Sequence, residues 1–69
     1  MGGTLPAVLN AANEIAVSAF LERKISFPRI WKTVAAVMER HTNVAHPDLD
    51  AILRADQWAR REAQKSAAD

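Results

Sequence analysis

The sequence predicts an all-α fold, a small three-helix bundle. Three stretches carry apolar residues at intervals of three and four, which is the period of one helix face. Short polar segments at residues 24–26 and 42–48 separate them, and the second contains Pro47. Both glycines lie at the start of the chain, and no stretch alternates as a strand does. We therefore expect one domain over residues 1–69, with helices at about 5–23, 27–41 and 49–66.

The first helix is predicted to follow Thr4, a favourable N-cap, with Pro6 in its first turn. Arg23 and Lys24 suit the negative end of the helix dipole. The apolar residues spread over an arc too wide for a single partner, which indicates packing against several neighbours. The main members of this arc are Val8, Leu9, Ala12, Ile15, Ala16, Ala19 and Phe20.

The second helix is predicted to begin after its N-cap, Ser26, and to bury one face, which carries Phe27, Ile30, Trp31, Val34, Val37 and Met38. Asp48 is the expected N-cap of the third helix. Asp56 has the chemistry of a second N-cap, so the third helix is expected to break or bend near it. Trp31 and Trp58 fall at helical spacing with aliphatic residues and are predicted to anchor the core.

Composition excludes several classes of function. The chain has no cysteine, so it has no disulfide and no thiolate metal site. Nine basic and eight acidic residues give a net charge of +1. A charge this small does not indicate binding to nucleic acid. No apolar run approaches the roughly 20 residues of a membrane span. We expect neither nucleic acid nor a membrane as a partner.

Three polar residues, Asn10, Asn13 and Glu14, stand together on the otherwise apolar first helix. A carboxylate between amides has the chemistry of a general base or a metal ligand, but no histidine or second carboxylate on that helix completes a site. The alternative is a structural joint, because buried amides need hydrogen-bond partners. We expect these residues to bond backbone groups of residues 2–5 or of another domain.

Two other groups of residues have the chemistry of a binding site, but each also has a simpler structural interpretation. His41, His46 and Asp48 are potential metal ligands, but their spacing matches no known site. A helix-turn-helix domain would contact DNA through Arg60 and neighbouring cations. Asp56 and Glu62 make that helix too acidic for this role. We expect no catalytic, cofactor-binding or metal-binding residue in the chain.

A family resemblance covers essentially the whole chain. The sequence resembles the C-terminal helical domain of 1-deoxy-D-xylulose 5-phosphate reductoisomerase. The run Leu9-Asn10-Ala11-Ala12-Asn13-Glu14 is the most specific part. The resemblance extends over residues 2–17, 19–21, 24–27, 49–53, 55–56 and 58–60.

The resemblance implies a parent enzyme in the bacterial cytoplasm. That enzyme rearranges 1-deoxy-D-xylulose 5-phosphate and reduces it with NADPH to methylerythritol 4-phosphate, using a divalent cation (Mg, Mn or Co), in the non-mevalonate route to isoprenoids. Its NADPH-binding and catalytic domains would be the partners of this chain. The family's catalytic, metal and cofactor motifs have no counterpart here, so no such role is transferred to any residue.

The family's C-terminal domain is a four-helix bundle, and this sequence lacks the first of the four. We therefore expect the chain to be cut from something longer and to expose part of the arc over residues 8–20, through which it would self-associate. The alternatives are an independent helical interaction module and, less favoured, the DNA-binding domain.

Overall fold

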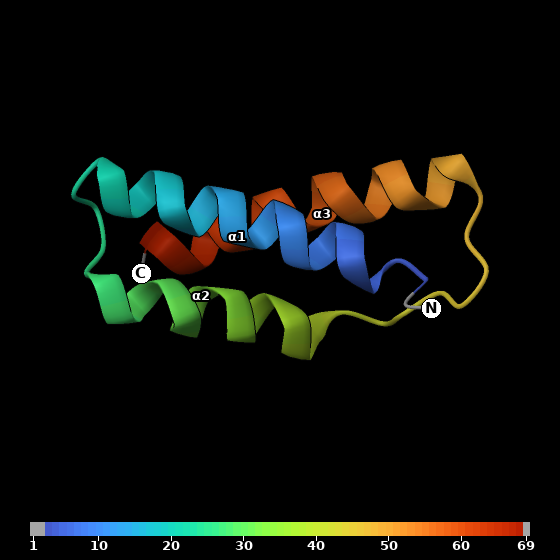
Figure 1. Cartoon of the computed structure of the whole chain (residues 1–69), viewed down its shortest axis with the longest axis horizontal. Coiled ribbons are helices and arrows are strands. Elements are labelled where there is room, and N and C mark those ends of the chain that lie inside the picture. Colours follow the sequence, from blue (N-terminus) through green and yellow to red (C-terminus); the bar gives the residue numbers. More distant parts are fainter. Residues whose placement is uncertain (1–2, 69) are drawn as a thin grey trace.

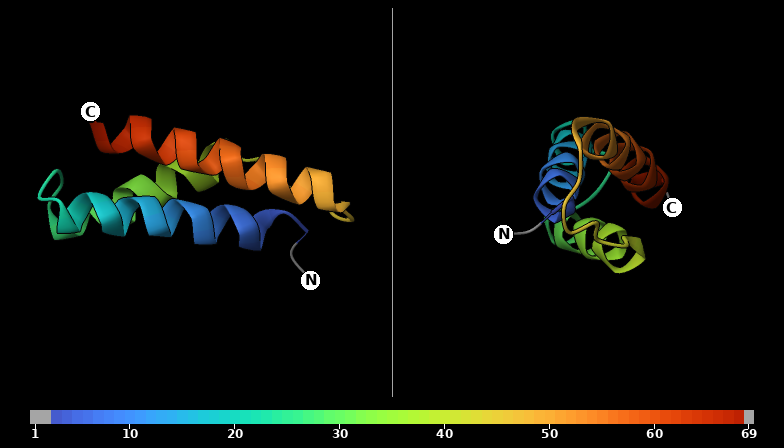
Figure 2. Two further views of the ribbon diagram at one scale, coloured as in Figure 1. Left: turned by 90° about the horizontal axis from the view of Figure 1, so that it is seen from above. Right: turned by 90° about the vertical axis from the view of Figure 1, so that its right-hand side faces the viewer.

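The chain forms a bundle of three helices in the computed structural model, which describes residues 3–68. They are α1 (Leu5–Leu21), α2 (Phe27–Arg40) and α3 (Leu49–Ala68). α2 runs antiparallel to α1, and α3 returns parallel to α1 (Figure 1). Seen end-on, the helices stand at the corners of a triangle (Figure 2). Residues 3–68 contain no strand, so the predicted all-α three-helix bundle is confirmed.

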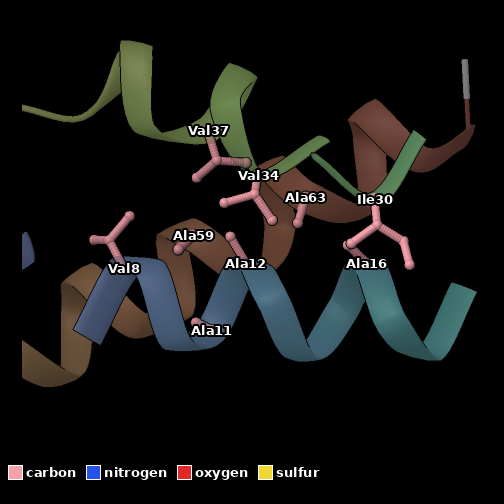
Figure 3. Close-up of a cluster of buried hydrophobic side chains, with 9 residues drawn as sticks. All are labelled: Val8, Ala11, Ala12, Ala16, Ile30, Val34, Val37, Ala59 and Ala63. Atoms are coloured by element: carbon pink, nitrogen blue, oxygen red, sulfur yellow. The ribbon is translucent and has the colours of Figure 1, made fainter. Parts of the chain in front are cut away.

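Small side chains dominate the core, and this lets the three helices approach closely. α1 contributes Val8 and a series of alanines, α3 contributes two more alanines, and α2 supplies larger aliphatic groups (Figure 3). The sequence predicts that part of the arc over residues 8–20 is exposed: in the structure Val8, Ala12 and Ala16 are buried, whereas Leu9 is 48% exposed. The buried apolar cluster consists of Val8, Ala11, Ala12, Ala16, Ile30, Val34, Val37, Ala59 and Ala63.

α1 ends at Leu21, before the predicted end, because the chain turns through a left-handed residue. Arg23 has φ of 64°. Its N–H donates to the carbonyl of Phe20 at 2.9 Å, and the N–H of Lys24 donates to that of Ala19 at 2.9 Å. These two bonds form a Schellman motif, in which glycine usually occupies the left-handed position. An arginine there gives no sequence signal for the stop.

The helix starts follow the predictions only in part. The Asp48 carboxylate accepts the N–H of Ala51 at 2.8 Å, so it caps α3 as predicted. Ser26 makes no side-chain capping bond. The expected break near Asp56 is wrong, because α3 is continuous across it. The Asp56 carboxylate accepts a hydrogen bond from Nε of Arg60, one turn further along α3, at 2.9 Å. It does not cap the start of a helix.

The two tryptophans differ sharply in their surroundings. Trp58 packs against the core, with its ring 5.7 Å from that of His41. Trp31 is 64% exposed, so the prediction that it anchors the core is wrong. Its spacing with Val34 and Met38 does not distinguish the edge of an apolar stripe from its centre.

The start of α1 is fastened to the loop between α2 and α3. The Thr4 N–H donates to the carbonyl of Val44 at 3.1 Å, and the Val44 N–H donates back to the Thr4 hydroxyl at 3.1 Å. Gly3 has φ of 52°, and a Cβ built on it would overlap the Val44 carbonyl oxygen. Glycine is therefore required there on two grounds, its backbone conformation and the close approach of the loop.

The Thr4 hydroxyl uses all of its hydrogen-bonding capacity in this contact. The side-chain oxygen of Asn43 accepts the N–H of Leu5 at 3.0 Å, which fixes the orientation of its amide. That oxygen must also accept the Thr4 O–H, 3.3 Å away. Nε2 of His41, 2.8 Å from the hydroxyl, is then the donor, together with the Val44 N–H. The arrangement assigns the His41 proton to Nε2, and it explains why Thr4 does not cap α1.

Replacing Thr4 with valine should lower the free energy of unfolding by about 1–3 kcal/mol. The change keeps the shape but leaves three polar groups around a 1% exposed position without their partner. Thr4→Ser, which retains the hydroxyl, should keep most of the stability. Urea denaturation of the 69-residue chain measures both variants, and equal midpoints for Thr4→Val and the wild type would contradict the role of the hydroxyl.

Replacing Thr33 with valine should instead stabilise the chain by about 1 kcal/mol. Thr33 is completely buried in α2, and its hydroxyl has no hydrogen-bond partner. Valine has the same shape and removes the unsatisfied group. Thr42→Val, in the exposed loop, is the matched control and should change little. A loss of stability in Thr33→Val, measured by thermal unfolding, would show that the hydroxyl has an unrecognised partner.

Candidate functional site

The predicted polar residues lie on the exposed surface of α1. Nδ2 of Asn10 donates to Oε2 of Glu14 at 3.1 Å. The same oxygen accepts Nη2 of Arg60 from α3 at 2.8 Å. Arg60 also donates to Asp56, so four side chains form one chain of hydrogen bonds across the groove between α1 and α3. None of these side chains bonds residues 3–5, whose partner is the 41–44 loop.

The charges in this chain of bonds compensate one another. Hydrogen bonding to Asp56, and then to Glu14, raises the pKa of Arg60, so the guanidinium stays charged. The Arg60 side chain is 37% exposed and that of Glu14 is 54% exposed, so water screens the pair. The Glu14 carboxylate is engaged with an arginine on the surface. This arrangement suits a link between two helices and not a general base.

A shallow hollow adjoins these residues on the outer side of α1. Pro6, Leu9, Asn10 and Asn13 line it, over a volume of about 370 Å³. Their spacing of three and four places them on one helix face. Leu9 is 48% exposed, and within residues 3–68 the Asn13 side chain has no hydrogen bond. The hollow thus combines an uncovered apolar group with an amide that can both donate and accept.

The potential metal ligands His41 and Asp48 have separate structural roles. His41 bonds Thr4, and Asp48 caps α3. Residues 3–68 contain no group of three or more potential ligands placed to hold a metal ion.

Two of the cations considered for DNA binding, Arg60 and Lys65, have partners on the bundle surface. Arg60 pairs with two carboxylates, and Nζ of Lys65 lies 3.2 Å from Glu62. Within the described residues, no helix is long and apolar enough to cross a membrane.

Two sets of residues escaped the sequence reasoning. Asn43 in the loop binds the start of α1, and nothing local in the sequence marks that long-range contact. The exposed aromatic pair Phe27 and Trp31 was assigned to the buried face of α2. The sequence signal in this stretch is its charge, because residues 23–38 contain four basic residues and no acidic one.

Comparison with known proteins gives one consistent result. A family model described as the DXP reductoisomerase C-terminal domain matches residues 1–62. The chain is 60% identical over 65 residues to a 1-deoxy-D-xylulose 5-phosphate reductoisomerase of Symbiobacterium thermophilum, covering 94% of this chain and 17% of the relative. It is 56% identical over 66 residues to the protein of that name from a Synechococcus species, covering 96% and 17%. The chain therefore spans about a sixth of the length of these relatives.

Proposed function

The chain belongs to the DXP reductoisomerase C-terminal domain family, and we propose that it is the structural C-terminal domain of such an enzyme. The parent would convert 1-deoxy-D-xylulose 5-phosphate to methylerythritol 4-phosphate with NADPH and a divalent cation, in the bacterial cytoplasm. The relatives' name supports the reaction. The other domains of the polypeptide would bind NADPH and the cation, and they would be the partners of this one.

A structural role fits the chemistry of the described residues. Several of their titratable groups are engaged in helix-to-helix pairs, a cap and the Thr4 contact, and residues 3–68 hold no group of three or more potential metal ligands. What the surface offers is contact area. Asn10, Asn13 and Leu9 lie side by side around the hollow on α1, where they present two amides and an aliphatic group. We assign this hollow to the joint with the rest of the parent, which the domain would brace.

The activity is tested on the complete polypeptide that contains this chain. It should oxidise NADPH in the presence of 1-deoxy-D-xylulose 5-phosphate and a divalent cation. The isolated 69-residue chain should not, and a polypeptide that stops before residue 1 should unfold at a lower temperature and lose most of the activity. An inactive complete polypeptide, or a truncated one with full activity and stability, would overturn the proposal.

Replacing Asn13 with leucine tests whether its side chain contacts the rest of the parent protein. In the isolated chain, where Asn13 is exposed and unbonded, the free energy of unfolding should change by less than about 0.5 kcal/mol. In the complete polypeptide it should fall by about 1–3 kcal/mol, because the partner of the amide would be left unsatisfied. Gln57→Leu, an exposed amide on α3, is the control. An equal effect of Asn13→Leu in both proteins would remove Asn13 from the joint.

A further inference from the structure

Two leucines in the first two turns of α3 are open to water. Leu49 is 70% exposed and Leu53 is 51% exposed. They are four residues apart and are therefore neighbours on the helix surface. α3 packs on the other two helices through a different side, which carries the buried Ala59 and Ala63. Leu49 and Leu53 thus form a short apolar strip that the bundle does not cover.

Two opposite charges lie beside this strip. Asp50 and Arg54 each follow one of the leucines by one position, about 100° around the helix, so both lie along the same edge of the strip. Both are exposed, and within residues 3–68 neither side chain has a hydrogen bond or an ion pair. Asp56, Arg60 and Glu62, further along α3, are all paired. The start of α3 therefore presents an unpaired carboxylate and an unpaired guanidinium next to exposed leucines.

The order of these four residues is complementary to itself. When a two-fold axis relates two identical helices that run antiparallel, a residue before the axis faces a residue after it in the second copy. An axis at Ile52, the midpoint of Asp50 and Arg54, places each Asp50 opposite the Arg54 of the second copy. The same axis brings the two leucine strips together. A parallel arrangement would instead place like charges opposite each other, so the sequence favours the antiparallel one.

We propose that this face of α3, made of Leu49, Asp50, Leu53 and Arg54, binds the same face of a second copy of the chain in an antiparallel dimer. The charges identify the occupant, because a second copy supplies them in the required reverse order. Two helical turns bury far less than the roughly 800 Å² per partner of a standard interface, so the dimer is weak. The inference does not rest on the proposed function. Its face also differs from the arc over residues 8–20, through which the sequence predicts self-association.

Sedimentation equilibrium of the 69-residue chain measures this association. We expect a monomer–dimer equilibrium with the dimer well populated at about 1 mM. Leu53→Lys places a charge in the apolar contact and should weaken the dimer about tenfold or more. Leu21→Lys is the matched control, because Leu21 is 72% exposed at the end of α1, at the opposite end of the bundle from the start of α3 (Figure 1). A chain that stays monomeric, a dimer that survives Leu53→Lys, or equal weakening by both substitutions would overturn the proposal.

Charge reversal tests the pairing between the two copies. Asp50→Arg leaves two arginines on the face, and Arg54→Asp leaves two aspartates, so each variant alone should associate several-fold more weakly than the wild type. An equal mixture of the two variants again has opposite charges in both pairs and should form a mixed dimer about as tightly as the wild type. Single variants that associate like the wild type, or a mixture that associates no better than its components, would overturn the antiparallel dimer.

Two controls separate this pairing from other effects of charge. Glu39→Arg and Lys32→Asp, at exposed positions of α2, make the same two changes in net charge, and alone or mixed they should associate like the wild type. Asp50 also lies in the first turn of α3, where it suits the helix dipole, so circular dichroism checks that each variant stays helical. Mixing does not repair a weakened helix, so recovery in the mixture reports the pairing. The same pattern of loss and recovery in the α2 variants would overturn the proposal.

Discussion

The hydroxyl of Thr4 joins parts of the chain that lie 37 to 40 residues apart. It donates to Asn43 and accepts from His41 and Val44, so the beginning of α1 and the loop after α2 are fixed against each other. The position of that loop determines where α3 starts. Alanines on α1 and α3 then allow the two helices to lie close and parallel. The bundle thus depends on one buried polar contact, at the end where α1 begins and the loop from α2 to α3 passes (Figure 1).

Periodicity predicts the helices, because burial of one face is a property of a local segment. It does not predict what polar side chains bind. Thr4 and Asp56 have the chemistry of N-caps, but Thr4 bonds a distant loop and Asp56 bonds Arg60. The end of α1 is missed because an arginine takes the left-handed position that glycine normally marks. In each case a competing partner, or a backbone geometry that the residue type does not reveal, determines the result.

The sequence predicts that the residues of the candidate site are neighbours, but it does not predict how exposed they are within residues 3–68. Asn10, Asn13 and Glu14 are neighbours, as their spacing requires, yet they lie on the surface of α1. The sequence could not show that Arg60, 46 residues away, would satisfy Glu14. It also could not separate the two amides by role. Asn10 contributes to the link between helices, whereas Asn13 is left facing outward beside Leu9. Only the second has bonding capacity wholly available to another domain.

The distribution of side-chain size connects these observations. A domain that folds for itself normally places its largest apolar groups inside, where each contributes most to stability. Here alanine, valine and Ile30 fill the centre, while Leu9, Phe27 and Trp31 remain exposed. Small central residues bring the helices together but bury little area per residue, so a chain of this length gains only a small margin over its conformational entropy. The large exterior groups hold the apolar area that remains to be buried. Contact with further parts of a longer polypeptide would bury it, and the same contacts would determine how the domain is oriented.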